Sequence, residues 1–148
     1  MAKGIEFRDF ICLSVHLAFR SEAQLVQEVS ELADQVRSLR RGSQKPCIVA
    51  GDFNVGFGCS LPGALGPFSG SASHFARYFL DFVLAHSVVV INSFYDHPAS
   101  HVACNPHAGS TDIDWVMISS SMPFQTTECV YHDANDYIKT DHYSITWH

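Results

Sequence analysis

The sequence predicts an α/β or α+β domain built around a mixed sheet, and three observations support this. Six short apolar, β-prone runs and two stretches with helically spaced apolar residues follow one another in the order β-α-β-α-β-β-β-β. The chain has 148 residues, 47% of them hydrophobic and 16% charged, which is enough apolar sequence for a core. No repeat, low-complexity tract or linker divides the chain. A single domain is therefore predicted over residues 1–148.

The first half of the chain predicts a strand, a helix and a second strand. Residues 10–17 are apolar and β-prone, so they predict the first strand. Residues 21–24 have the pattern of a capping box, which begins a helix, and Gly42 supplies its end. Residues 46–51 predict the second strand, which starts at a proline. The helix has one apolar face, formed by Leu25, Val29, Leu32, Val36 and Leu39.

The second half predicts a loop, a second helix and four more strands. Residues 55–71 hold five of the nine glycines and two of the six prolines, so they predict a long loop. Ser73 is expected to cap the second helix, whose buried face is Phe75, Phe79, Phe82 and Val83. Strands are predicted over residues 87–92, 112–119, 125–131 and 142–147, with an irregular segment over 93–110.

Charge and cysteine content restrict the partners and the compartment. The net charge is −6, from 9 Lys and Arg against 15 Asp and Glu, so the chain as a whole does not attract a phosphate backbone. The densest basic group, Arg37, Arg40 and Arg41, complements the end of the predicted helix and is a local basic patch at most. Five cysteines without a CxxC pair predict free thiols, and hence an intracellular protein. The sequence has no run of 18 apolar residues, so no membrane partner is expected.

Polar side chains gather at the ends of the predicted strands. Asp52 and Asn54 follow one strand, and His16 lies at the end of another. Each also has a purely structural explanation. An Asp-Asn pair is common in turns, and the polar groups of a His at a strand end usually have hydrogen-bond partners within the fold. Asp114 is more informative, since a carboxylate within an apolar strand needs a partner. The pair Asp141-His142 is weak evidence when it is taken alone, because a solvated loop explains it.

Together these groups can carry phosphoester chemistry. A hard cation such as Mg²⁺ needs carboxylate oxygen ligands, and Asp141 can supply one. A histidine that handles protons needs a carboxylate to hold its tautomer, and Asp114 can hold His142 in that way. Asp52 can orient an attacking water, and Asn54 can donate to a phosphate oxygen. His16 can contact the phosphate or serve the leaving group.

The order of four short segments resembles the endonuclease/exonuclease/phosphatase superfamily, which includes deoxyribonucleases, apurinic/apyrimidinic endonucleases, sphingomyelinases, deadenylases and retrotransposon endonucleases. The segments are Ser14-Val15-His16-Leu17, Gly51-Asp52-Phe53-Asn54, Ile113-Asp114-Trp115 and Thr140-Asp141-His142, and the resemblance runs from Phe10 to Trp147. It implies an α+β fold, part of a four-layer α/β/β/α sandwich with mixed sheets. It also implies phosphodiester hydrolysis with Mg²⁺ or Mn²⁺.

The resemblance assigns a role to each matching position. Asp52 and Asn54 match the pair that positions the nucleophilic water and the scissile phosphate, and His142 matches the catalytic histidine. Asp114 matches the carboxylate that orients this histidine, and Asp141 matches a metal ligand. His16 matches a strand-end position that is His or Tyr in different branches. Which group acts as the general base is argued differently across the superfamily, so that role is not assigned.

The sequence departs from the family pattern at its start. The family carries an Asn on an early strand and then a metal-binding Glu, whereas no strand is predicted before residue 10, and Glu6 is not in the family's context. The chain is therefore predicted to be the C-terminal part of the domain, without the N-terminal strands, and to bind Mg²⁺ weakly.

Three functions follow from the resemblance. The first is a metal-dependent endonuclease of the retrotransposon type, acting on DNA and located inside the cell, in the nucleus. The second is a catalytically inactive fragment or relic of such a domain. The third is a phosphatase or a sphingomyelinase-type phosphoesterase. The sequence makes no prediction of the oligomeric state.

Overall fold

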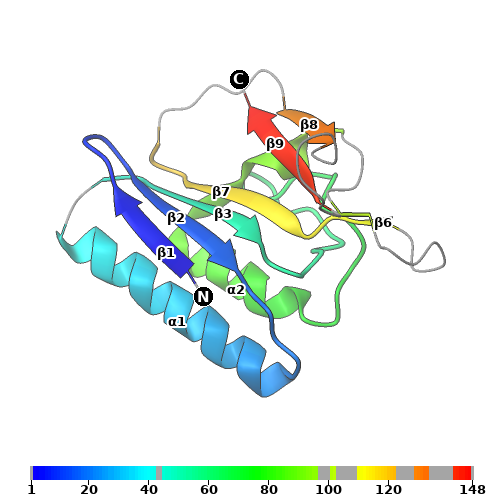
Figure 1. Ribbon diagram of the computed structural model, residues 1–148, viewed down its shortest axis with the longest axis horizontal. Coiled ribbons are helices and arrows are strands. Elements are labelled where there is room, and N and C mark those ends of the chain that lie inside the picture. The colour runs from blue at the N-terminus through cyan, green and yellow to red at the C-terminus, as the bar shows by residue number, and fades with distance from the viewer. Residues whose placement is uncertain are drawn as a thin grey trace.

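A five-stranded mixed sheet is the centre of the fold (Figure 1). The computed structural model describes residues 2–42, 45–96, 101–102, 110–122, 129–133 and 142–147. In spatial order the strands are β1 (Ala2–Glu6), β2 (Ile11–His16), β3 (Cys47–Asp52), β7 (Asp114–Ser119) and β4 (Val88–Val90). The pair β2–β3 is parallel and the other three pairs are antiparallel. These strands and two long helices confirm the α+β fold with a mixed sheet.

Two helices cover one face of this sheet (Figure 1). Helix α1 (Glu22–Gly42) makes the crossover between the parallel strands β2 and β3, and helix α2 (Ala76–His86) leads into β4. The predicted capping box is present, because the Ser21 hydroxyl accepts from the Gln24 amide at 3.3 Å and the Gln24 side chain accepts from the Arg20 amide at 2.9 Å. The reciprocal bond thus reaches one residue further back than in the usual box.

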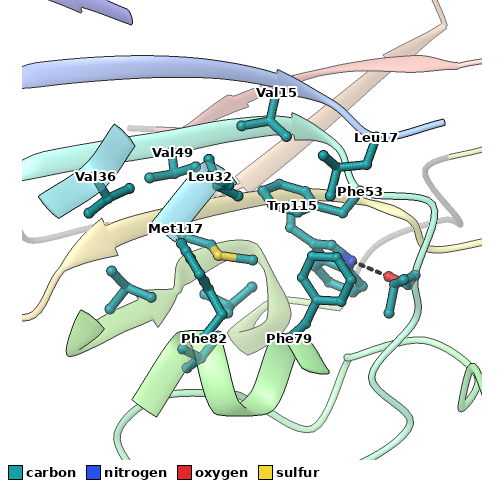
Figure 2. Close-up of a cluster of buried hydrophobic side chains, with 14 of the residues drawn as sticks. Val15, Leu17, Leu32, Val36, Val49, Phe53, Phe79, Phe82, Trp115 and Met117 are labelled. Carbon is teal, nitrogen blue, oxygen red and sulfur yellow. Dashed lines mark hydrogen bonds between the residues drawn. The ribbon is translucent and has the colours of Figure 1, made fainter. Parts of the chain in front are cut away.

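The main core lies between the sheet and the helices (Figure 2). Alternate residues of β2, β3, β7 and β4 point into it, as the period of two requires. It contains Val15, Val49, Trp115 and Met117 from the sheet and Leu32, Val36, Phe79 and Phe82 from the helices. A smaller cluster on the opposite face holds Ile91, Val116 and Ile118. The sheet therefore has apolar residues on both faces.

Several predicted elements differ from the structure at their ends. Ser73 is not the cap of α2, since Phe75 is the N-cap residue and makes no side-chain cap bond. The predicted strand over 87–92 is cut short at Val90, where the 3₁₀ helix η1 (Ile91–Phe94) begins. The predicted irregular segment over 93–110 contains part of η1 and the paired strands β5 (His101–Val102) and β6 (Ser110–Thr111).

The last two predicted strands form a pair of their own. Strand β8 (Cys129–Asp133) pairs antiparallel with β9 (Tyr143–Trp147), and Figure 1 shows both on the side of the sheet opposite α1. Within the part of the chain that the structure describes, no helix has the length and apolar character needed to cross a bilayer.

The prediction that no strand precedes residue 10 is wrong. Strand β1 pairs with β2 along the edge of the sheet, with Ala2 opposite Val15 and Glu6 opposite Ile11. It gave no sequence signal because four of its five residues are exposed, so no apolar alternation marks it. Glu6 lies at the end of the sheet away from His16, where it forms an ion pair with Lys45 at 2.7 Å.

Candidate active site

Three polar side chains lie side by side at one end of the three central strands of the sheet. The register pairs His16 of β2 with Asp52 of β3, and Asp52 with Asp114 of β7. They share the face away from the helices, because their strand neighbours Val15 and Trp115 point into the main core. Strand pairing alone therefore assembles an imidazole and two carboxylates in one row.

Gly51 lets strands β2 and β3 approach closely at this row. Its φ is +143°, and a Cβ atom built on it would lie 1.9 Å from the Val15 carbonyl oxygen of the neighbouring strand. Only glycine fits a backbone of this kind without strain. The residue that precedes Asp52 is thus dictated by the packing of the sheet.

Phe53 and Asn54 form the turn that fixes the Asp52 side chain. Phe53 is fully buried and meets the Phe79 ring edge-on at 5.8 Å. Asn54 has a left-handed φ of 53°, and its amide N–H donates to Asp52 Oδ1 at 2.8 Å, which is an Asx turn. The Asn54 side-chain Nδ2 donates to Asp52 Oδ2 at 3.1 Å and to the Leu17 carbonyl at 2.7 Å. Both Asp52 oxygens are therefore held by one neighbour.

His142 is bonded to Asp114. Its Nδ1 lies 2.9 Å from Asp114 Oδ2, and the two side chains are 31% and 14% exposed. Since a carboxylate only accepts, Nδ1 carries the proton in this bond, and in the neutral imidazole Nε2 then has the lone pair. The partnership predicted for this carboxylate and histidine is present in the structure.

Asp52 is the point where the groups converge. Its Oδ2 lies 3.8 Å from His16 Nε2 and 3.9 Å from His142 Nε2. Both separations exceed a hydrogen bond, so these atoms face each other without being bonded. Burial raises the pKa of Asp52, and the nearby Asp114 charge raises it further, against the lowering effects of the Asn54 amide and the two histidines. A carboxylate of this kind is a stronger base than an exposed one.

The backbone around Asp114 is held from both sides. Phe53 N–H donates to the Ile113 carbonyl at 2.9 Å, and Trp115 Nε1 donates to the Val55 carbonyl at 2.6 Å, the bond drawn in Figure 2. On the other side, the Asn92 side chain contacts the Asp114 carbonyl and the Val116 amide. Asn92 was not among the residues predicted for the site, and the available signal was a polar residue directly after the apolar run Val88–Ile91.

The described residues do not form a metal site by themselves. Among them, no group of three or more His, Cys, Asp or Glu side chains is arranged to hold an ion. Two carboxylates are present in the row, but Asp114 is bonded to His142, and Asp52 is bonded to Asn54. The predicted metal ligand Asp141 lies outside the described residues.

The structure thus brings five of the six predicted site residues together. His16, Asp52, Asn54, Asp114 and His142 converge within the distances given above. They come from the ends of β2 and β3, the start of β7 and the residue before β9.

Solved structures of known proteins have the same fold. No protein-family model and no curated protein sequence matches the chain. The 3′ phosphatase NExo from Neisseria, bound to a product DNA hairpin, matches 99% of this chain with a TM-score of 0.69 and 13% identity. A second structure, the 3′-5′ exonuclease NExo from Neisseria meningitidis, matches with the same score and 14% identity. A mannosyl-6-phosphatase from Bacteroides thetaiotaomicron matches 92% of this chain with a TM-score of 0.59 and 17% identity.

These neighbours are nuclease and phosphatase members of the endonuclease/exonuclease/phosphatase family. A further match is a protein of Bacteroides thetaiotaomicron described by that family name, with a TM-score of 0.59 and 16% identity. The chain spans 63% and 64% of the length of the two NExo structures and 49% of the mannosyl-6-phosphatase. At these identities the likeness shows the fold, which agrees with the fold implied by the four sequence motifs.

Proposed function

We propose that this chain carries catalytic residues of a metal-dependent phosphodiester hydrolase that acts on nucleic acid. The observation behind the proposal is the arrangement of His142, which is bonded to Asp114 through Nδ1 and turns Nε2 towards Asp52. A histidine that is oriented by one carboxylate and faces another is equipped to exchange protons with a substrate bound beside the two groups.

Each residue of the row would have a distinct task. Asp114 holds the His142 tautomer, so that Nε2 faces the reacting group. Asp52, whose pKa is raised by burial, orients a water or accepts its proton. The His16 side chain is 70% exposed and lies on the other side of Asp52 from Asp114. There it can meet a phosphate oxygen or a leaving group.

Asn54 fits a positioning task in this arrangement. Its Nδ2 already donates to Leu17 and to Asp52, so donation to a phosphate requires it to give up one of these bonds. If it gives up the longer bond, which is the one to Asp52 Oδ2, substrate binding also changes the environment of Asp52.

Asp141 is the residue that we propose as the metal ligand. Mg²⁺ or Mn²⁺ bound there would act as a Lewis acid on the phosphate. The tasks that we propose for the residues described above are binding, orientation and proton transfer.

Nucleic acid is the substrate class that we favour, with DNA first. One structural neighbour is a 3′ phosphatase bound to a DNA hairpin and another is an exonuclease, whereas a third acts on a phosphorylated sugar. An endonuclease of the retrotransposon type is the narrower hypothesis, and it rests on the motif resemblance alone. The net charge of the chain is −6, so contact with DNA would depend on local basic groups and on a metal.

The test is nicking of supercoiled plasmid in Mg²⁺ by the wild-type chain and by His142→Ala. Loss of proton transfer typically lowers a rate by about 10²–10⁴-fold, so we expect His142→Ala to be at least about 100-fold slower. His74→Ala is the matched control, because this histidine is exposed and contacts the ring of Phe75, which packs against the main core and not against the site. It should nick at the wild-type rate.

The alternatives give different results in the same experiment. Equal, metal-independent background in all three proteins would reject the enzyme for this chain and favour an inactive fragment. Hydrolysis of p-nitrophenyl phosphate or a sugar phosphate without nicking would favour the phosphatase.

A further inference from the structure

Asn92 is a buried polar residue at the point where strand β4 stops pairing with β7. Its exposed fraction is 1%, and it lies in η1, two residues after the end of β4. The β4–β7 ladder runs from Val88 opposite Ser119 to Val90 opposite Met117. Beyond Val90 the chain turns away, and the backbone of β7 loses its partner on that side.

The Asn92 side chain takes the place of that lost partner. Its Nδ2 donates to the Asp114 carbonyl at 3.0 Å, and its Oδ1 accepts from the Val116 amide at 3.0 Å. A primary amide has one donor side and one acceptor side, like a peptide group, so it can extend a ladder by one pair. Without it, two backbone groups at the start of β7 would lose these bonds in a largely buried setting.

One of the two bonds is made to the residue that orients His142. The Asp114 carbonyl accepts from Asn92, and the Asp114 side chain lies 2.9 Å from Nδ1 of His142, while Trp115 is the residue between the two bonded backbone groups. On the other edge of β7, Asp52 of β3 is paired with Asp114. The Asp114 backbone is thus clamped between a strand on one side and one side-chain amide on the other.

We propose that Asn92 is a positioning residue, which sets the place of Asp114 and, through it, the tautomer and orientation of His142. Its catalytic consequence rests on the proposed hydrolase function, whereas its effect on the Asp114–His142 bond does not. Asp at position 92 would keep the acceptor for Val116 and lose the donor to Asp114. Ala would lose both.

The experiment records the ring nitrogens of His142 by long-range ¹H–¹⁵N NMR on the full chain, with His142→Ala to assign the signal. The wild type is expected to have the proton on Nδ1, as the bond to Asp114 requires. In Asn92→Asp and Asn92→Ala the signal should move towards the Nε2–H tautomer. Where the chain is active, kcat should fall by about 10-fold or more with KM unchanged, the scale typical of a lost outer-shell partner.

Ser93→Ala is the matched control. Ser93 is fully buried in the same turn, accepts from the Gly66 amide at 2.8 Å and donates to the Val90 carbonyl at 2.6 Å. Its removal therefore also costs two buried hydrogen bonds, but neither reaches β7. It should leave the His142 tautomer as in the wild type, even where it lowers the melting temperature.

Each outcome decides the matter. Any of three results would overturn the positioning role. The first is a wild-type His142 tautomer in both Asn92 variants, and the second is an equal change of this tautomer in Ser93→Ala. The third is a wild-type protein whose His142 has no proton on Nδ1. Normal kcat in an Asn92 variant whose tautomer has changed would overturn its catalytic consequence. An inactive wild type with the expected tautomer changes would instead reject the proposed function and leave the positioning of Asp114 intact.

Discussion

Replacing Gly51 by alanine should damage the sheet at the row of site residues. The added Cβ would lie 1.9 Å from the Val15 carbonyl oxygen, whereas real Cβ contacts are essentially never under 3.0 Å. The two strands would have to separate by about 1 Å at this pair, which is enough to disturb the hydrogen bonds between β2 and β3. The φ of +143° adds backbone strain, because this region suits glycine alone.

The size of the effect follows from these two costs. A non-glycine residue in such a backbone region costs about 1–3 kcal/mol. Forcing extra atoms into a packed site costs about 1–3 kcal/mol more. We therefore expect Gly51→Ala to lose about 4 kcal/mol of the free energy of unfolding. For a chain of 148 residues this corresponds to a fall in melting temperature of about 8–16 °C.

The assay is urea unfolding followed by circular dichroism, with Gly63→Ala as the control. Gly63 also has a positive φ, +77°, but a Cβ there would meet nothing within 4 Å. It should therefore show backbone strain alone, about 1 kcal/mol. The difference between the two variants measures the steric cost together with any greater backbone strain at position 51. A Gly51→Ala loss no larger than that of Gly63→Ala would refute the reasoning.

Two further predictions concern Trp115 and Asp52. Trp115→Phe removes the donor to the Val55 carbonyl, and since both residues are buried it should cost about 1–3 kcal/mol in urea unfolding; a loss within about 0.5 kcal/mol, as at surface sites, would contradict this. Burial raises the folded pKa of Asp52 above 3.8, so the wild type should lose stability relative to Asp52→Asn as pH rises from 3.8 towards 7. The bond from Asn54 Nδ2 changes in that variant at every pH, so the test is the pH dependence of the difference, and a difference that is constant with pH would contradict the assignment.

The elements with a buried apolar period were predictable from the sequence. Helix α1 shows this well, since its buried residues Leu25, Leu32 and Val36 recur at helical spacing and its capping box is present. Strand β1 was not predictable because its side chains are exposed and carry no alternation. The cap of α2 was missed because Ser73 bonds to the Phe75 amide inside a turn that precedes the helix.

The site was predictable as a set of residues but not as a geometry. The motifs named Asp52, Asp114 and His142, and the structure brings them together. The register that sets Asp52 opposite Asp114 depends on the pairing of strands more than 60 positions apart, which no local pattern specifies. Asn92 was missed for a related reason, since its bonds go to a strand that begins 22 positions later.

The site residues of the sheet and His142 are held in place by different interactions, so the two parts of the site differ in the structural changes that they tolerate. His16, Asp52 and Asp114 are placed by backbone pairing, with parallel strands aligning the ends of β2 and β3 and an antiparallel strand bringing the start of β7 beside them. Their positions are therefore as stable as the sheet. His142 lies outside this sheet, next to β9, and its bond to Asp114 links it to the row. Asp114 belongs to both arrangements, so a shift of its backbone would separate His142 from the row while the fold survives.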